Sequence, residues 1–177
     1  YLDREMRETP ALALGRAIHV AVLEPERFVQ DYGLMPEGMD RRTKAGKAQW
    51  GGRIEQFGEG NVLSPDDHAI CMAIRDAGHQ HQTAAALIGG SGDVELSLVW
   101  DDPDTGVRCK ARWDRYSPEI PGGAIVDLKT TRDASRPAFE RAIFTYGYHR
   151  QASLYLMGAR ALALPVRHYC IIAAEKE

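Results

Sequence analysis

The sequence of 177 residues contains only three cysteines, Cys71, Cys109 and Cys170, which lie far apart along the chain. An odd number of scattered cysteines excludes the disulfide framework of a small secreted protein and indicates reduced thiols. Three thiols are also too few for an iron–sulfur cluster held by four cysteine ligands. We therefore expect a cytoplasmic protein without such a cluster.

The sequence also lacks long apolar segments, a strong net charge and repeats. The sequence has no apolar run of about 18 residues and no signal-peptide pattern, which predicts neither a membrane protein nor a secreted one. Its net charge of −3 gives no global sign of a nucleic-acid-binding protein. We find no internal repeat, low-complexity tract or interdomain linker. With 44% hydrophobic residues, the chain is expected to form one globular domain over residues 1–177. Because it begins at Tyr1 and stops soon after a strand-like segment, we expect a domain excised from a longer protein and truncated at both ends.

Two carboxylates are predicted to face each other on a β-hairpin. An apolar run at residues 124–129 ends in Asp127 and Lys129, and an earlier charged stretch carries Asp114. Residues 117–123 between them are rich in Pro and Gly and can reverse the chain. Antiparallel pairing centred near Ile120 places the two aspartates opposite each other, with Cβ atoms about 5 Å apart. Lys129 then projects from the same face as Asp127.

This arrangement predicts a metal site. Two carboxylates so close repel each other unless a cation lies between them. A neighbouring lysine is suited to polarise a phosphate or to orient a water molecule. Oxygen ligands and an incomplete protein cage favour Mg²⁺, with Mn²⁺ as a substitute, over zinc. We therefore interpret the hairpin as a divalent-metal site for phosphodiester chemistry, with Asp114, Asp127 and the main-chain carbonyl of Leu128 as ligands and Lys129 as the catalytic cation.

The preceding segment extends the predicted sheet. Residues 94–100 alternate between apolar and polar positions, which is typical of a half-buried strand. A turn centred on Pro103 and Asp104 sets Glu95 opposite Arg112, and the next ladder sets Arg112 opposite Lys129. Glu95 is then a third candidate carboxylate, in the row next to the two aspartates. The alternative is an ordinary solvated sheet face, although burying several unpaired charges there would be costly.

Helices are expected on both sides of this three-stranded antiparallel meander. Pro10 is typical of a first helical turn, and Ser64 is typical of a helix N-cap. The predicted helices span residues 11–23, 41–57, 65 to about 77, 83–88, 135–144 and about 148–163, and a final strand spans residues 166–173. The predicted fold class is therefore α/β (α+β), with a central mixed sheet flanked by helices.

The order of several short motifs resembles a known superfamily. Gly15 and His19, then Asp114, then Asp127-Leu-Lys129, and finally Gln151 and Tyr155 resemble the PD-(D/E)XK nucleases of the RecB and lambda-exonuclease type, with their restriction-endonuclease-like core. The segments at residues 14–19, 23–28 and 146–152 look like the exonuclease VIII (RecE) family of bacterial and prophage nuclease domains. The resemblance runs from about residue 10 to the C-terminus.

The resemblance implies an activity and partners. It implies Mg²⁺-dependent 5′→3′ digestion of linear double-stranded DNA, leaving 3′ single strands for phage-type recombination. It also implies a ring-shaped homo-oligomer that encloses DNA ends, and a single-strand annealing protein of the RecT type as a partner. His19 is implied to reach the metal centre, although a lone histidine on an apolar helix face is otherwise more often a core residue.

Further residues are candidates for contacts with DNA or for support of the site. Gln151 and Tyr155 are one helical turn apart and share a face with Tyr148, so they contact the DNA end or simply pack beside the sheet. Arginines could track phosphates or form a solvated helix face. The candidates are Arg112 and Arg132, with residues 41–53 and Arg136, Arg141 and Arg150 as further basic positions.

Three other functions remain open from the sequence. A RecB-like or restriction-like endonuclease would use the same residues. A catalytically inactive DNA-binding module of the same fold is disfavoured by the intact Asp114, Asp127 and Lys129. A sheet protein that binds sugars or proteins without metal is the third alternative.

Overall fold

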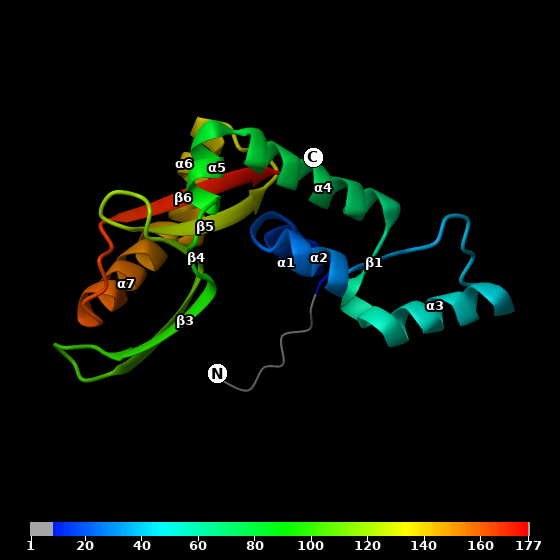
Figure 1. Cartoon of the computed structure of the whole chain (residues 1–177), viewed down its shortest axis with the longest axis horizontal. Coiled ribbons are helices and arrows are strands. Elements are labelled where there is room, and N and C mark those ends of the chain that lie inside the picture. The colour runs from blue at the N-terminus through cyan, green and yellow to red at the C-terminus, as the bar shows by residue number, and fades with distance from the viewer. Residues whose placement is uncertain (1–8, 177) are drawn as a thin grey trace. The chain divides into compact units, whose positions relative to one another are not determined.

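The computed structural model describes residues 9–176 and is shown in Figure 1. It is a mixed α/β structure that divides into two compact units, with the boundary between Arg75 and Asp76. Each unit is described by itself. Among the described residues, no helix combines the length and the apolar character needed to cross a membrane.

The first unit is mainly helical. Its elements are α1 (Pro10–Leu23), α2 (Pro25–Asp31), α3 (Lys44–Phe57), the 3-10 turn η1 (Glu59–Asn61) and the short parallel strands β1 (Gly33–Leu34) and β2 (Val62–Leu63). Thr9 caps α1 by accepting a hydrogen bond from Leu12 N at 3.3 Å. The helix predicted at residues 11–23 is confirmed, and the one predicted at 41–57 is confirmed from Lys44 onward, with Thr43 as its N-cap. Helix α2 and the β1–β2 pair were not predicted.

Two further helices lead to the main sheet. Helix α4 (Pro65–Gln80) begins where Ser64 Oγ accepts a hydrogen bond from Asp67 N at 3.1 Å, which confirms Ser64 as the predicted N-cap. The helix runs three residues beyond its predicted end near residue 77. Helix α5 (Gln82–Ile88) follows at once and confirms the helix expected at residues 83–88.

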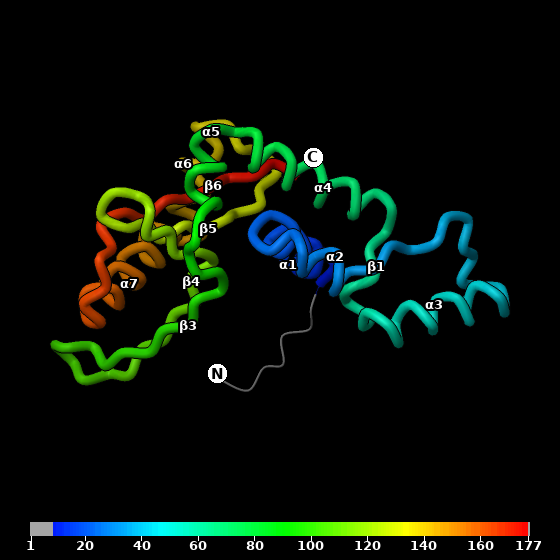
Figure 2. Tube along the Cα trace, viewed as in Figure 1, coloured from blue at the N-terminus to red at the C-terminus, as the bar shows by residue number. Residues whose placement is uncertain are grey.

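A four-stranded sheet dominates the second unit. Strands β3 (Val94–Asp101), β4 (Arg108–Ser117) and β5 (Ala124–Thr131) form an antiparallel meander, and β6 (His168–Glu175) pairs in parallel with β5. Figure 2 follows this course along the chain. Helices α6 (Arg136–Tyr146) and α7 (Tyr148–Ala161) form the crossover that a parallel connection requires. The predicted mixed sheet with a three-stranded meander is therefore confirmed.

The apolar faces of the sheet and of α7 pack together. Trp100, Trp113 and Ile125 are almost completely buried in one cluster, as the period-two pattern predicts for the strands. Gly158 of α7 lies against Trp100, and a Cβ atom at this glycine would come within 2.9 Å of the indole ring. The absence of a side chain at Gly158 thus lets α7 approach the meander closely.

The pairing of β3 with β4 differs from the prediction by two residues. Ser97, not Glu95, lies opposite Arg112, and the register brings Glu95 opposite Asp114. The reason is the turn: Asp102 N donates to Val107 O at 2.8 Å, and Asp102 Oδ1 accepts from Thr105 N at 2.8 Å. This local bonding centres the turn one residue later than expected. Glu95 therefore belongs to the row of Asp114 and Asp127 instead of the row of Arg112.

A buried arginine fixes the segment that enters β3. Arg115 is only 3% exposed, and its guanidinium donates hydrogen bonds to the carbonyls of Gly89, Gly90 and Gly92 and to Ser117 Oγ. Carbonyl oxygens thus take the place of a carboxylate partner for this charge. The bonds hold the chain just before the strand that carries Glu95.

We expect Arg115→Met to destabilise the protein by about 3 kcal/mol, because three loop carbonyls and the buried Ser117 hydroxyl would lose a charged donor. Thermal or denaturant unfolding monitored by circular dichroism measures the change. The matched control is Arg108→Met, since Arg108 forms an exposed ion pair with Asp101 and its loss should leave stability nearly unchanged. Equal effects of the two substitutions would contradict the structural role of Arg115.

Candidate active site

Two aspartates meet at the centre of the sheet. Arg115 of β4 lies opposite Val126 of β5, so the next position in register places Asp114 opposite Asp127, as predicted. Asp127 is 1% exposed, and Asp114 Oδ2 accepts a hydrogen bond from Leu128 N at 2.8 Å. The side chain of Asp114 thus bonds to β5 directly beyond the last regular ladder pair.

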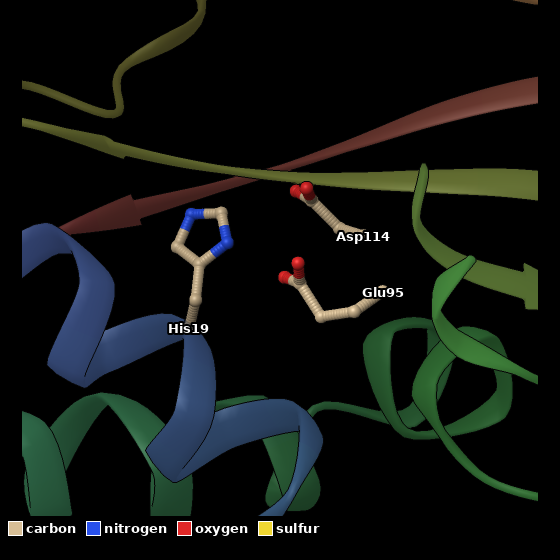
Figure 3. Close-up of side chains that lie close together, drawn as sticks. All are labelled: His19, Glu95 and Asp114. Carbon is tan, nitrogen blue, oxygen red and sulfur yellow. The ribbon is translucent and has the colours of Figure 1, made fainter. Parts of the chain in front are cut away.

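Glu95 completes a row of three acids. One of its carboxylate oxygens lies within 4.8 Å of a carboxylate oxygen of Asp114, and both side chains are drawn in Figure 3. Glu95 Oε2 also forms an ion pair with Arg112 Nε at 2.7 Å. Glu95 and Arg112 are therefore neighbours, as predicted. They are not directly opposite each other, however, because the ion pair joins diagonal positions of β3 and β4.

The backbone at Glu95 is unusual. Its φ of 53° lies in the left-handed region, which costs a residue with a side chain on the order of 1 kcal/mol or more. Such a conformation persists only where its surroundings impose it, and it is concentrated at functional sites. Here it occurs at the residue that brings the third carboxylate to the acid row.

Lys129 lies beside the acid row. Its Nζ atom is 2.5 Å from Asp127 Oδ2 and 5.0 Å from the centroid of the Tyr148 ring. The side chain is only 18% exposed, so the ammonium group is held in a largely dry position. This confirms that Lys129 and Asp127 share a face of the sheet.

Helix α7 contacts the other carboxylate oxygen of the same aspartate. Gln151 Nε2 donates to Asp127 Oδ1 at 3.2 Å and to Tyr155 Oη at 3.1 Å. Tyr155 Oη in turn donates to the carbonyl of Arg112 at 2.9 Å. The predicted shared face of Gln151 and Tyr155 is thus directed at the acid row, where the two residues can fix the orientation of the Asp127 carboxylate.

The structure gives the positions of His19, Arg132 and Leu128 but not their predicted contacts with metal or DNA. His19 lies half-buried on α1 in the first unit, and Arg132 is exposed just after β5. Leu128 is buried, and its main-chain N–H donates a hydrogen bond to Asp114 of the acid row. The metal contacts of His19 and of the Leu128 carbonyl, and the DNA contacts of Arg132, therefore stay predictions.

Tyr169 of β6 was not predicted. Its hydroxyl oxygen is buried and has no hydrogen-bond partner with good geometry among residues 9–176. Burial raises the pKa of this phenol, and the charge of Asp127 raises it further. Tyr169 lies opposite Ile125 in the β5–β6 ladder, two positions before the partner of Asp127. Side chains alternate between the two faces of a strand, so the sequence of residues 168–175 could have placed Tyr169 near the acids once the parallel pairing was known.

The electrostatics of the acid row favour a cation. Burial and the neighbouring charge of Asp127 raise the pKa of Asp114 to about 6, although the Leu128 N–H and the charges of Lys129 and Arg112 oppose this increase. Asp127 Oδ2 is buried, and among the described residues no donor meets hydrogen-bond geometry toward it, although Lys129 Nζ forms a close ion pair. Carboxylate oxygens are ligands of hard divalent cations. The acid row therefore fits a hard divalent cation.

The raised pKa predicts how the metal-free protein responds to pH. An acid whose pKa is higher in the folded state stabilises the fold only when protonated, so stability falls as the pH rises from about 4 to about 7. For Asp114 the change is on the order of 3 kcal/mol. Denaturant unfolding in a chelator should show this decrease for the wild type and a smaller one for Asp114→Asn, whose amide oxygen can still accept from Leu128 N. Parallel curves for the two proteins would contradict the prediction.

A comparison of the sequence with models of known protein families gives a match that is consistent with this site. A family model described as "PDDEXK-like domain of unknown function (DUF3799)" matches residues 2–177. No protein in a search of curated proteins matches the chain. The matched range includes the three acids of the row and Lys129.

Proposed function

Since the chain belongs to this PDDEXK-like family, within the PD-(D/E)XK nuclease superfamily, we propose that it is a Mg²⁺-dependent exodeoxyribonuclease that degrades linear double-stranded DNA. The observation that carries the proposal is the row of Glu95, Asp114 and Asp127, with the Lys129 ammonium 2.5 Å from Asp127. An acid row with one adjacent lysine is suited to the hydrolysis of phosphodiester bonds.

The acids would hold the metal. Asp114 and Asp127 supply the facing carboxylates, and Glu95 supplies a third, either directly or through water. The chemistry that Mg²⁺ supplies when bound is activation of water and neutralisation of charge on the phosphate. His19 and the Leu128 carbonyl are further proposed ligands, on the basis of the family resemblance.

The protein's own groups would orient the reaction. The ammonium of Lys129 can donate hydrogen bonds to the attacking water or to a phosphate oxygen, where negative charge increases in the transition state. Gln151 holds Oδ1 of Asp127, and Arg112 holds Glu95, so both carboxylates are oriented before substrate binds. Because Asp127 is buried and Lys129 is largely buried, their electrostatic interactions are stronger than those of the same groups on a solvated surface. Aspartate at position 127 takes the place of the glutamate found in many active sites of this type.

The preference for DNA ends is supported by the resemblance to the exonuclease VIII type. We propose 5′→3′ digestion that leaves 3′ single strands, within a ring of subunits that encloses the duplex. Enclosure would permit processive digestion without strong phosphate contacts in each subunit, which suits a chain of net charge −3. An annealing protein of the RecT type would then receive the single strand.

Linear and closed-circular duplex DNA of the same sequence test the end preference. With Mg²⁺, the protein should degrade the linear DNA and leave the closed circle intact, while a chelator should stop degradation of the linear form. Size-exclusion chromatography of the same sample tests the proposed ring. Cleavage of closed circles at a rate comparable to that of linear DNA would contradict the exonuclease proposal and favour an endonuclease with the same catalytic residues.

A further inference from the structure

Aromatic side chains are exposed where α6 meets α7. Phe144 is 73% exposed and Tyr146 is 69% exposed, although large aromatic rings usually contribute to a core. The rings are arranged in pairs: the centroids of Tyr146 and Tyr148 are 5.7 Å apart, and those of Phe144 and His149 are 5.4 Å apart. Exposed aromatic rings grouped in one short stretch of the chain are typical of a site of interaction.

One of these pairs leads to the acid row. The ring of Tyr148 contacts both Tyr146 and the proposed catalytic cation, since Lys129 Nζ is 5.0 Å from the Tyr148 centroid. Lys129 Nζ is itself 2.5 Å from Asp127 Oδ2. A continuous series of contacts therefore runs from the exposed ring of Tyr146 to the acids that would hold the metal. A flat group resting on Tyr146 would be separated from the Lys129 ammonium by the ring of Tyr148.

Positive charge accompanies the aromatic rings. The guanidinium of Arg150 lies beside Gly147, since a Cβ atom at this glycine would come 2.6 Å from Arg150 Nη2. Arg150 also lines a groove of about 690 Å³ between α7 and the β3–β4 hairpin, together with the cations Lys110 and Arg112. Rings for stacking next to cations for phosphates match the two chemical parts of a nucleotide.

We propose that Tyr146 and Tyr148 form a stacking surface for an unpaired nucleobase of the DNA strand in the active site, with Arg150 neutralising its phosphate backbone. This inference rests on the proposed function and adds a binding site for single-stranded DNA beside the catalytic centre. Stacking uses the flat face that all four bases share, so the site should accept every base. It would hold a nucleotide that has separated from its complement, next to the scissile phosphate.

The test is binding of short single-stranded oligonucleotides to the metal-free protein, in which hydrolysis does not interfere. Each oligonucleotide carries 2-aminopurine at one position, and stacking on a tyrosine ring quenches its fluorescence. Tyr146→Ala should weaken binding about tenfold and abolish quenching at one position. Tyr146→Phe should retain both, because it keeps the ring. Phe144→Ala is the matched control, since Phe144 is equally exposed on the same helix but pairs with His149 instead of Tyr148.

An abasic site at the quenched position completes a thermodynamic cycle. It should weaken binding by the wild type about as much as Tyr146→Ala does, and it should weaken binding by Tyr146→Ala no further. If Tyr146→Ala lowered the affinity for intact and for abasic oligonucleotides by the same factor, the stacking proposal would be overturned. A Tyr146→Phe variant that binds as weakly as Tyr146→Ala would also overturn it. Unchanged binding with altered self-association would assign the rings to contacts between copies of the chain and would also overturn it.

Measurements of binding and of hydrolysis distinguish a failure of this inference from a failure of the proposed function on which it rests. A protein that shows the predicted cycle but hydrolyses no DNA with Mg²⁺ would contradict the proposed nuclease activity and support the stacking surface. A protein that degrades DNA but binds intact oligonucleotides equally well with and without the Tyr146 ring would support the nuclease and contradict the stacking surface.

Discussion

Asp114→Asn and Asp127→Asn should each reduce Mg²⁺-dependent DNA hydrolysis by at least about 1,000-fold, because each removes one of two facing charges that would hold the metal. The fold should survive. Asparagine at position 114 can still accept the hydrogen bond from Leu128 N, and loss of either charge removes the repulsion that, after burial, raises the pKa of Asp114. The measurement is the rate of release of nucleotides from linear duplex, together with circular dichroism of each variant.

The control for these variants is Asp104→Asn. Asp104 is exposed in the turn between β3 and β4, so the substitution makes the same chemical change outside the acid row. Its activity should equal that of the wild type. Folded Asp114→Asn or Asp127→Asn protein with substantial Mg²⁺-dependent activity would show that the hydrolytic centre lies elsewhere.

Lys129→Ala should reduce the rate of the chemical step by about 100- to 1,000-fold while the protein still binds metal. The reason is that the ammonium acts on water and phosphate, whereas the carboxylates bind the cation. Single-turnover digestion measures the chemical step, and isothermal titration with Mn²⁺ measures metal affinity. Removal of the ion pair with Asp127 should leave metal affinity unchanged or increase it, because Lys129 competes with the metal for Asp127 Oδ2.

Lys129→Arg is the matched variant, since it keeps the charge but changes the shape and donor geometry of the side chain. We expect it to remain well below wild-type activity, because a planar guanidinium cannot reproduce the position of an ammonium group that is largely enclosed by Asp127 and Tyr148. A collapse of Mn²⁺ affinity in Lys129→Ala would indicate that the lysine supports the metal site structurally, and would contradict its role in the chemical step.

The facing aspartates could be predicted because local chemistry determines their register. Pro118, Pro121 and the two glycines that follow limit where the chain can reverse, and the apolar run 124–128 must be buried. Once the hairpin is centred, Asp114 and Asp127 face each other without any further information. Lys129 follows from the two-residue period of a strand.

The position of Glu95 could not be predicted with the same certainty. Pro103 suggested the turn centre, but Asp102 bonds through its side chain to Thr105 and moves the centre by one residue. Because the shift changes the partner of every residue of β3 by two positions, Glu95 faces Asp114 instead of Arg112. The bonding capacity of an aspartate at the start of a turn was the signal that could have corrected the register.

Residues joined by long-range contacts were the hardest to predict. Tyr169 reaches the surroundings of Asp127 only because β6 returns in parallel beside β5 after two helices. Helix α2 is a different case: its seven residues are too few for a periodic pattern, although Pro25 at its first turn was an available signal.

Digestion of end-labelled linear duplex DNA, with Mg²⁺ and with a chelator, tests the central claim most directly. The account predicts progressive loss of nucleotides from the ends in Mg²⁺, none in the chelator, and recovery when Mg²⁺ or Mn²⁺ is added back. DNA that remains intact in Mg²⁺ and Mn²⁺, in the presence of folded protein that binds it, would contradict the claim that the row of Glu95, Asp114 and Asp127 with Lys129 is a hydrolytic centre.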